Sequence, residues 1–200
     1  MSGPQVDERT FTVTPAPYRA IDTAVEADWS QAGFWYAAAF LDPPLTLSGL
    51  TPRSPQGDKA ISDLYCKLAR PGDATIDLSP CPDLLPPLAV MAAARRGTTE
   101  ITGGARLRIK ERDRLATVAA MLLRLGIRAE EHPEGRTVTD GTFTGGTVDG
   151  ANDHRIVMAA AIAATRADAP VTILGAQAVS KSYPNFFEEF KRLGGVFDVL

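Results

Sequence analysis

The chain has 200 residues, of which 44% are hydrophobic and 22% charged, and its formal net charge is −3 at pH 7. A chain of this length can bury a hydrophobic core as one large domain or two small ones, and its mild acidity excludes general nucleic-acid binding through a broad basic face. The two cysteines are too few for a disulfide framework, and the sequence has neither an apolar run of membrane-spanning length nor a signal peptide, so we expect a cytoplasmic protein that does not bind membranes.

Hydrophobic periodicity and turn residues predict an α/β organisation along the whole chain. In chain order, the predicted helices span residues 32–41, 58–69, 82–95, 111–125, 153–164 and 183–193. The predicted strands span residues 45–50, 75–78, 98–102, 127–131, 137–139, 171–174 and 196–200. A hairpin turn is expected at residues 132–135, where His-Pro-Glu-Gly joins two of these strands.

Aspartate and lysine positions reveal a repeat. Three Ala-rich predicted helices begin beside an aspartate, namely Asp28, Asp83 and Asp153. After each helix come a strand, a glycine-containing loop, a lysine and a second helix, and the lysines are Lys59, Lys110 and Lys181. The separations between aspartate and lysine are similar, at 31, 27 and 28 residues. We therefore expect a three-fold pseudo-symmetric α/β domain built from repeated βαβα-type units.

Charge is most concentrated in residues 106–115, which contain five lysines or arginines and two carboxylates. If the three units share an axis, the N-termini of the predicted helices meet at one end of the domain. Helix N-termini carry partial positive charge and free N–H groups, which attract anions. Together with Lys110, Arg114, Arg155 and Lys181, this pattern predicts a phosphate- or carboxylate-binding site, because arginine forks hold such oxygens in pairs.

Three segments resemble the hallmark motifs of the C-terminal half of 5-enolpyruvylshikimate-3-phosphate (EPSP) synthase: RIKERDRL at 108–115, NDHRIVMA at 152–159 and KSYPNF at 181–186. Weaker family segments match in the expected order at 25–28, 56–58 and 77–83. The resemblance runs from about residue 11 to residue 200. It implies one of the family's two globules, an enolpyruvyl transferase-like inside-out α/β barrel. Residues 1–24 would then be a tail and hinge strand left from the absent first globule, and residues 25–200 the C-terminal enolpyruvyl transferase domain.

The resembled family transfers the enolpyruvyl group of phosphoenolpyruvate to the 5-hydroxyl of shikimate 3-phosphate. This step of the shikimate pathway leads to chorismate and the aromatic amino acids, and it uses no metal and no organic cofactor. The reaction needs a base for the hydroxyl proton and an acid for the methylene carbon. The resemblance implies that Asp83 is the base and Glu111 the acid.

The same resemblance assigns the cations. Lys110 would lie against shikimate 3-phosphate and the reacting centre, and Arg114, Arg155 and Lys181 would hold phosphoenolpyruvate. His154 flanks this cluster and is expected to have a supporting role at most.

Residue patterns alone leave simpler interpretations open. Glu111 and Asp113 could pair with neighbouring cations on a solvated helix start, and Asp83 could be only an N-cap. Asp28 and Lys59 belong to the most degenerate unit, and we assign them to structure.

Three departures from the family pattern stand out. Arg112 occupies a position where the family usually has a small hydroxyl residue, and the link between Ala69 and Asp73 is shortened. The chain also has only about half the family's usual length. Two hypotheses follow: either the chain is catalytic only together with the missing N-terminal half and inactive alone, or it is an isolated non-catalytic anion-binding or assembly domain of the same fold.

Overall fold

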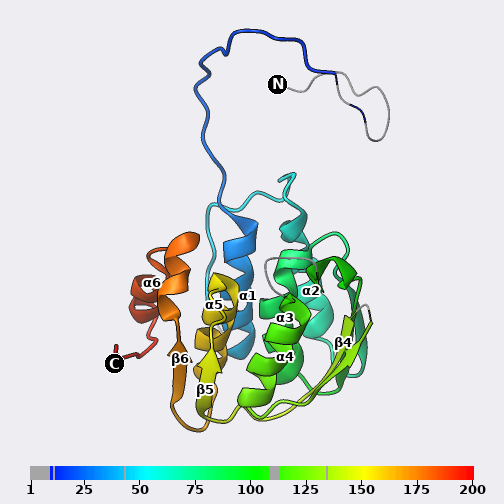
Figure 1. The fold of residues 1–200 in the computed structure, drawn as a ribbon, viewed down its shortest axis with the longest axis vertical. Coiled ribbons are helices and arrows are strands. Elements are labelled where there is room, and N and C mark those ends of the chain that lie inside the picture. The colour runs from blue at the N-terminus through cyan, green and yellow to red at the C-terminus, as the bar shows by residue number, and fades with distance from the viewer. Residues whose placement is uncertain (1–9, 11, 43, 109–112, 134) are drawn as a thin grey trace.

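In a computed structural model, the structure describes residues 10, 12–42, 44–108, 113–133 and 135–200. The helices lie side by side, with a four-stranded sheet along one side of them and a two-stranded sheet along another (Figure 1). Residues 12–25 extend away from this body and are all exposed.

The described part of the chain forms the predicted alternation of helices and strands. Its α-helices are α1 (Trp29–Leu41), α2 (Ile61–Leu68), α3 (Leu85–Ala94), α4 (Arg114–Arg124), α5 (His154–Ala164) and α6 (Phe186–Arg192). Short 3₁₀ helices are η1 (Gly57–Ala60), η2 (Pro82–Leu84), η3 (Ala105–Arg108) and η4 (Ala176–Lys181). Its strands are β1 (Ala74–Asp77), β2 (Thr98–Thr102), β3 (Ala129–His132), β4 (Gly135–Thr139), β5 (Gly146–Asp149) and β6 (Val171–Leu174).

The three Ala-rich helices α1, α3 and α5 pack against one another in the centre of the domain. Almost every residue of α3 is buried, because its small and apolar side chains let neighbouring backbones approach closely. Pro86 and Pro87 lie in the first turn of α3, where a missing backbone N–H breaks no helical hydrogen bond.

Parallel strand pairs bracket two of these central helices. Strands β1 and β2 precede and follow α3 and pair in parallel, while β5 and β6 do the same around α5. The predicted hairpin forms from β3 and β4, and β4 joins the larger sheet antiparallel to β2, giving the order β1-β2-β4-β3. The α/β class and the repeated units expected from the sequence are thereby confirmed.

Some sequence-based predictions of elements were wrong. Residues 45–50 have the alternating burial of a strand, but neither they nor residues 196–200 pair with a described strand, and a strand needs such a partner for its N–H and C=O groups. Strand β5 was not predicted, because only Val148 in it is buried. Helix α6 begins at Phe186 rather than at residue 183.

Helix α4 begins later than predicted. Asp113 is extended and accepts a hydrogen bond from the backbone N–H of Ala116, so it caps the helix. None of the helices in the described residues combines the length and the apolar character that crossing a membrane requires.

Candidate active site

Asp83 lies where three segments distant in sequence meet. Its carboxylate oxygens accept hydrogen bonds from Arg114 Nη1 at 2.6 Å and from Arg155 Nη2 at 3.0 Å. Asp83 comes from η2 just before α3, and the two arginines come from the first turns of α4 and α5. The shared axis expected from the repeat thus brings three of the predicted site residues into direct contact.

Arg114 joins a second carboxylate to this cluster. Its Nε donates to Asp153 Oδ2 at 3.0 Å, while Asp153 Oδ1 accepts from the backbone N–H of Arg155 and caps α5. Only 8% of Arg114 is exposed, so its guanidinium is held between two carboxylates with little solvent around it. Such a partly buried, charge-assisted arrangement fixes the orientation of all three groups.

His154 donates no proton to its arginine neighbour. Its Nε2 lies 2.9 Å from Arg155 Nη1, and a guanidinium can only donate hydrogen bonds, so the imidazole accepts through Nε2. Burial lowers the pKa of His154 below its ordinary value, and the charge of Arg155 lowers it further. The neutral ring therefore orients Arg155, which fits the supporting role expected for it.

Lys181 lies at the end of η4, where its Nζ donates to the backbone carbonyl of Asn152 at 2.8 Å. Asn152 and Ala151 both have positive φ, at 55° and 51°, a left-handed conformation that costs non-glycine residues energy. This strained turn places Asp153 at the N-cap position of α5. The Lys181 charge is also among the causes that lower the pKa of His154, so Lys181 borders the same cluster.

Two further residues of this region, Ser30 and Asp58, were not predicted as site residues. Asp58 accepts a short hydrogen bond from Ser30 Oγ and is 9% exposed. Burial raises the pKa of Asp58, and the charge of Asp83 also raises it, while Ser30 and Arg155 act in the opposite direction. Asp58 is therefore close enough to the cluster for its charges to act on it, and the only sequence signal for Asp58 was its place in the weak match at residues 56–58.

The two residues assigned to structure have structural contacts. Asp28 accepts from the backbone N–H groups of Ser30 at 2.7 Å and Gln31 at 3.3 Å and so caps α1. Lys59 donates from Nζ to the backbone carbonyl of Ser54 at 2.6 Å.

Lys110, Glu111 and Arg112 lie outside the described residues. The residues on either side of them are paired: Arg108 Nη1 contacts Asp113 Oδ2 at 3.0 Å. Arg108 also contacts Glu131, and this hydrogen bond holds the pKa of Glu131 below its usual range. For Asp113 the simpler interpretation, pairing with a neighbouring cation, is therefore the one observed.

The cluster combines guanidinium and ammonium groups, carboxylates and two helix N-termini at one place. Such a site can bind an anion through Arg114, Arg155 and Lys181 while presenting a carboxylate as a proton acceptor. Within the described residues, no group of three or more His, Cys, Asp or Glu side chains is arranged to hold a metal ion.

Comparison with known proteins identifies the family to which the chain belongs. The family model for EPSP synthase (3-phosphoshikimate 1-carboxyvinyltransferase) matches residues 3–190, which is most of the chain. The chain belongs to the EPSP synthase family.

Relatives of the family also agree in sequence and fold. A 3-phosphoshikimate 1-carboxyvinyltransferase from Clostridium acetobutylicum is 44% identical over 185 residues, which cover 86% of this chain and 43% of the relative. An EPSP synthase structure from Acinetobacter baumannii is similar with a TM-score of 0.74 at 26% identity, covering 86% of this chain and 47% of that one. The enolpyruvyl transferase NikO from Streptomyces tendae, at 21% identity and a TM-score of 0.65, shares the fold. The chain spans about half the length of these proteins.

Proposed function

We propose that this chain supplies one wall of an enolpyruvyl transferase site, which transfers the enolpyruvyl group of phosphoenolpyruvate to the 5-hydroxyl of shikimate 3-phosphate. The other wall comes from the N-terminal half of the family's chain. In this proposal residues 25–200 are the C-terminal domain, residues 1–24 are the tail and hinge, and the protein works in the cytoplasm. The family membership and the half-length match support this division of the site.

The observation that carries the proposal is the double contact of Asp83 with Arg114 and Arg155. In the proposed reaction the 5-hydroxyl oxygen adds to C2 of phosphoenolpyruvate while C3 takes a proton. The adduct then loses phosphate and a C3 proton, which restores the double bond. Asp83 is the proposed base for the hydroxyl proton, and the two guanidinium groups hold its carboxylate in a fixed orientation.

Phosphoenolpyruvate carries a phosphate and a carboxylate, so its recognition requires several cations. We assign Arg114, Arg155 and Lys181 to this task, because they come from three different elements and border one cluster. The same cations stabilise negative charge that develops during the addition. His154 keeps Arg155 oriented through its Nε2 contact.

Two assignments rest on the motif at 108–115 alone. Glu111 is the proposed acid at the methylene carbon, and Lys110 is the proposed contact to shikimate 3-phosphate and the reacting centre. No metal or organic cofactor has a part in this proposal.

Phosphate release from both substrates tests the proposal. The chain alone should show no turnover, and activity should appear when the N-terminal half of the Clostridium acetobutylicum relative is added, because only then are both walls present. Asp83→Asn should then reduce kcat at least about 100-fold. Asp63→Asn, which changes an exposed aspartate of α2, is the matched control and should retain activity.

Two results would contradict the proposal. Robust turnover by the isolated chain would show that no second wall is needed. Tight phosphate binding, with no turnover even when an N-terminal half is added, would favour a non-catalytic anion-binding domain instead.

A further inference from the structure

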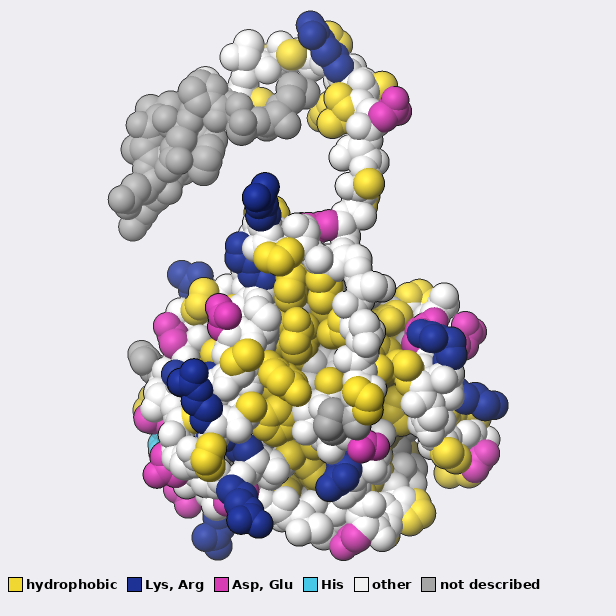
Figure 2. Space-filling view, turned by 180° about the vertical axis from the view of Figure 1, so that it is seen from behind, with side chains coloured by type: hydrophobic (Ala, Val, Ile, Leu, Met, Phe, Trp, Pro, Cys, Tyr) yellow, Lys and Arg dark blue, Asp and Glu magenta, His cyan; other side chains and the backbone are white. Residues whose placement is uncertain are grey.

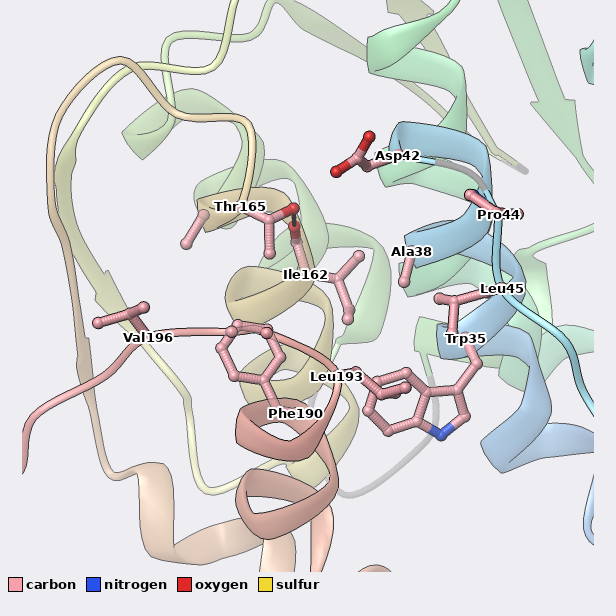
Figure 3. A pocket seen from close by; sticks show the side chains of 13 residues that line it. Trp35, Ala38, Asp42, Pro44, Leu45, Ile162, Thr165, Phe190, Leu193 and Val196 are labelled. Atoms are coloured by element: carbon pink, nitrogen blue, oxygen red, sulfur yellow. Dashed lines mark hydrogen bonds between the residues drawn. The ribbon is translucent and has the colours of Figure 1, made fainter.

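The large groove of the domain offers no cation to a ligand. It has a volume of about 570 Å³ and lies between α1, α5 and α6, with Trp35, Ile162 and Phe190 on its walls (Figure 3). None of the described residues that line it is a lysine or an arginine. An anion is therefore better held by the candidate site, where binding depends on how firmly each arginine is oriented.

Arg136 of β4 is a buried cation in a chain whose other described cations lie mostly at the surface. Figure 2 shows lysine and arginine side chains standing out from one face of the molecule, where water solvates their charge. Arg136, by contrast, is only 1% exposed. Burying a guanidinium costs free energy unless hydrogen bonds compensate for the lost water. The partners of Arg136 therefore indicate what its burial achieves.

The shortest contact of this guanidinium is with the first turn of α4. Arg136 Nη2 donates to the backbone carbonyl of Leu115 at 2.6 Å. The Glu131 carboxylate lies 3.5 Å from the same nitrogen, and the buried Nε of Arg136 has no partner among the described residues. A carbonyl oxygen has two lone pairs, so Leu115 can accept this bond in addition to a hydrogen bond of its own helix. The principal partner of Arg136 is thus the helix backbone rather than a carboxylate.

Arg108, at the end of η3, connects the same hairpin to the N-cap of α4. Its Nε donates to the carbonyl of Pro133 at 3.1 Å, and its Nη2 donates to that of His132 at 2.9 Å. Its Nη2 also contacts Glu131 Oε1 at 2.7 Å, and its Nη1 contacts Asp113 Oδ2 at 3.0 Å. Because Asp113 caps α4, the hairpin of β3 and β4 holds both the cap and the first turn of this helix.

Arg114 lies between these two anchored residues. Asp113 is held through Arg108, and Leu115 is held through Arg136, so the backbone is fixed on both sides of Arg114. From this position the Arg114 guanidinium reaches two carboxylates on other elements. A displacement of about 1 Å at such a place can cost about 100-fold in rate. The hairpin therefore controls a side chain of the candidate site from a distance.

The hairpin is an addition to the second of the repeated units. In the first unit α2 is followed directly by β1, whereas in the second the hairpin lies between α4 and β5. The sequence spacing shows the same addition, because Asp83 follows Lys59 by 24 residues and Asp153 follows Lys110 by 43. The added segment is thus attached to the helix that carries Arg114.

We propose that Arg136 is a positioning residue for Arg114. Together with Arg108, it fastens the start of α4 to the hairpin of β3 and β4, so that the Arg114 guanidinium keeps its place between two carboxylates. The order of the Arg114 side chain is a property of this chain alone. Only the effect on catalysis rests on the proposed function.

Hydrogen exchange of the Arg114 side chain tests this inference directly. In the full 200-residue chain, Arg114 Nε–H donates to Asp153 and should exchange slowly with solvent, which ¹⁵N NMR measures. Arg136→Met fills most of the native space without a donor, so it should speed this exchange at least about tenfold. Arg136→Lys retains a donor and should give an intermediate rate. Arg128→Met, at an exposed arginine just before β3, is the matched control and should leave the rate unchanged.

Arg108→Met tests the other side of the anchor. The Arg108 side chain is 32% exposed, so its loss leaves no buried cavity and the variant should fold, as circular dichroism can verify. The exchange of Arg114 Nε–H should rise at least about threefold, because the hold on Asp113 is lost. This variant decides the question if Arg136→Met does not fold.

The effect on catalysis is measured in the enzyme reconstituted with an N-terminal half. Arg136→Met should raise the KM for phosphoenolpyruvate at least about tenfold and change the KM for shikimate 3-phosphate less than about twofold. A general loss of structure would change both. Faster exchange of Arg114 with an unchanged KM for phosphoenolpyruvate would contradict the assignment of Arg114 to that substrate, and would still support its positioning by Arg136.

Two outcomes would overturn the inference. Exchange of Arg114 Nε–H within about twofold of the native rate in folded Arg136→Met, or in Arg108→Met if only that variant folds, would mean that the hairpin does not position Arg114. Equal exchange rates in Arg136→Met and Arg136→Lys would mean that the side chain acts by filling space rather than by donating to Leu115.

Discussion

Arg114 links two carboxylates of the candidate site, because its one side chain reaches both Asp83 and Asp153. This geometry depends on the planar fork of a guanidinium, which presents Nε–H and Nη–H groups to different acceptors. A lysine at this position keeps the charge but lacks the planar fork, so it cannot hold both carboxylates in the same geometry.

Arg114→Lys should therefore reduce kcat/KM at least about 100-fold in the enzyme reconstituted with an N-terminal half, since both carboxylates lose their common partner. Steady-state kinetics of phosphate release give the measurement. Arg124→Lys, at the exposed opposite end of α4, is the matched control. A change of less than about twofold in Arg114→Lys would rule out this role.

His154 should make folding stability depend on pH. Burial depresses its pKa in the folded protein below the ordinary value of 6.5. Above that pH the ring is neutral in both states, and as pH falls through it the unfolded chain takes up the proton first, so the free energy of unfolding decreases.

Urea denaturation at pH 7.5 and 5.5 measures this dependence. The native chain should lose more stability between these pH values than His154→Gln, in which the titrating ring is replaced by a side chain that still offers an acceptor to Arg155. Equal losses in the two proteins would show that His154 does not titrate differently on folding.

At the residue level, the sequence predicted which side chains lie together where each of them belongs to a motif of its own. Asp83, Arg114 and Arg155 were singled out and do lie together. Asp58 was not singled out, because its environment is created by Ser30, 28 residues earlier, and by Asp83. Such a pairing has no local pattern in the sequence.

Among the elements, the shortened link after α2 is stabilised by one buried side chain. Arg95, only 5% exposed, donates to the backbone carbonyls of Leu68 at 2.9 Å and Arg70 at 2.6 Å, and also to that of Gly72. The guanidinium thus provides hydrogen-bond donors for three backbone carbonyls at the end of α2 and in the link.

Arg95→Met should lower the free energy of unfolding by roughly 3 kcal/mol, because several carbonyls lose a charged donor at once. Chemical denaturation followed by circular dichroism gives the value. Arg96→Met is the matched control, since the neighbouring side chain is exposed and its loss should change stability by less than about 0.5 kcal/mol. A similar small effect for both variants would show that Arg95 does not hold the link.

Elements were predicted correctly where their own sequence stabilises them. The hairpin of β3 and β4 pairs two strands that are neighbours in sequence, and the predicted helix over 153–164 has a capping aspartate at its start. Residues 45–50 also have a strand pattern, but a strand forms only if a partner from elsewhere in the chain lies beside it. Sequence pattern alone therefore could not determine whether this segment is paired.

For the whole molecule, we expect the chain by itself to bind phosphoenolpyruvate weakly and in a salt-sensitive manner. Lys181 is exposed and Arg155 is half-buried, so ionic screening reduces their attraction for an anion. NMR titration should shift the side-chain signals of Arg114, Arg155 and Lys181, and the apparent Kd should rise several-fold between about 0.05 and 0.3 M salt.

Arg192 provides an internal reference for this titration. It forms an ion pair with Glu189 on α6, and its signals should not move. If the signals of the three site cations do not shift, or shift only together with those of Arg192, the result would argue against a specific anion site.

The pairing of Arg114 and Arg155 with Asp83 and Asp153 has a further consequence for selectivity. The site contains its own counterions at fixed positions, so an incoming anion must outcompete carboxylates whose effective concentration is far above that of salts in solution. A small ion such as chloride replaces one contact at most and gains little. A ligand with two anionic groups engages several cations at once, and the built-in carboxylates therefore select against simple salts and in favour of polyvalent ligands.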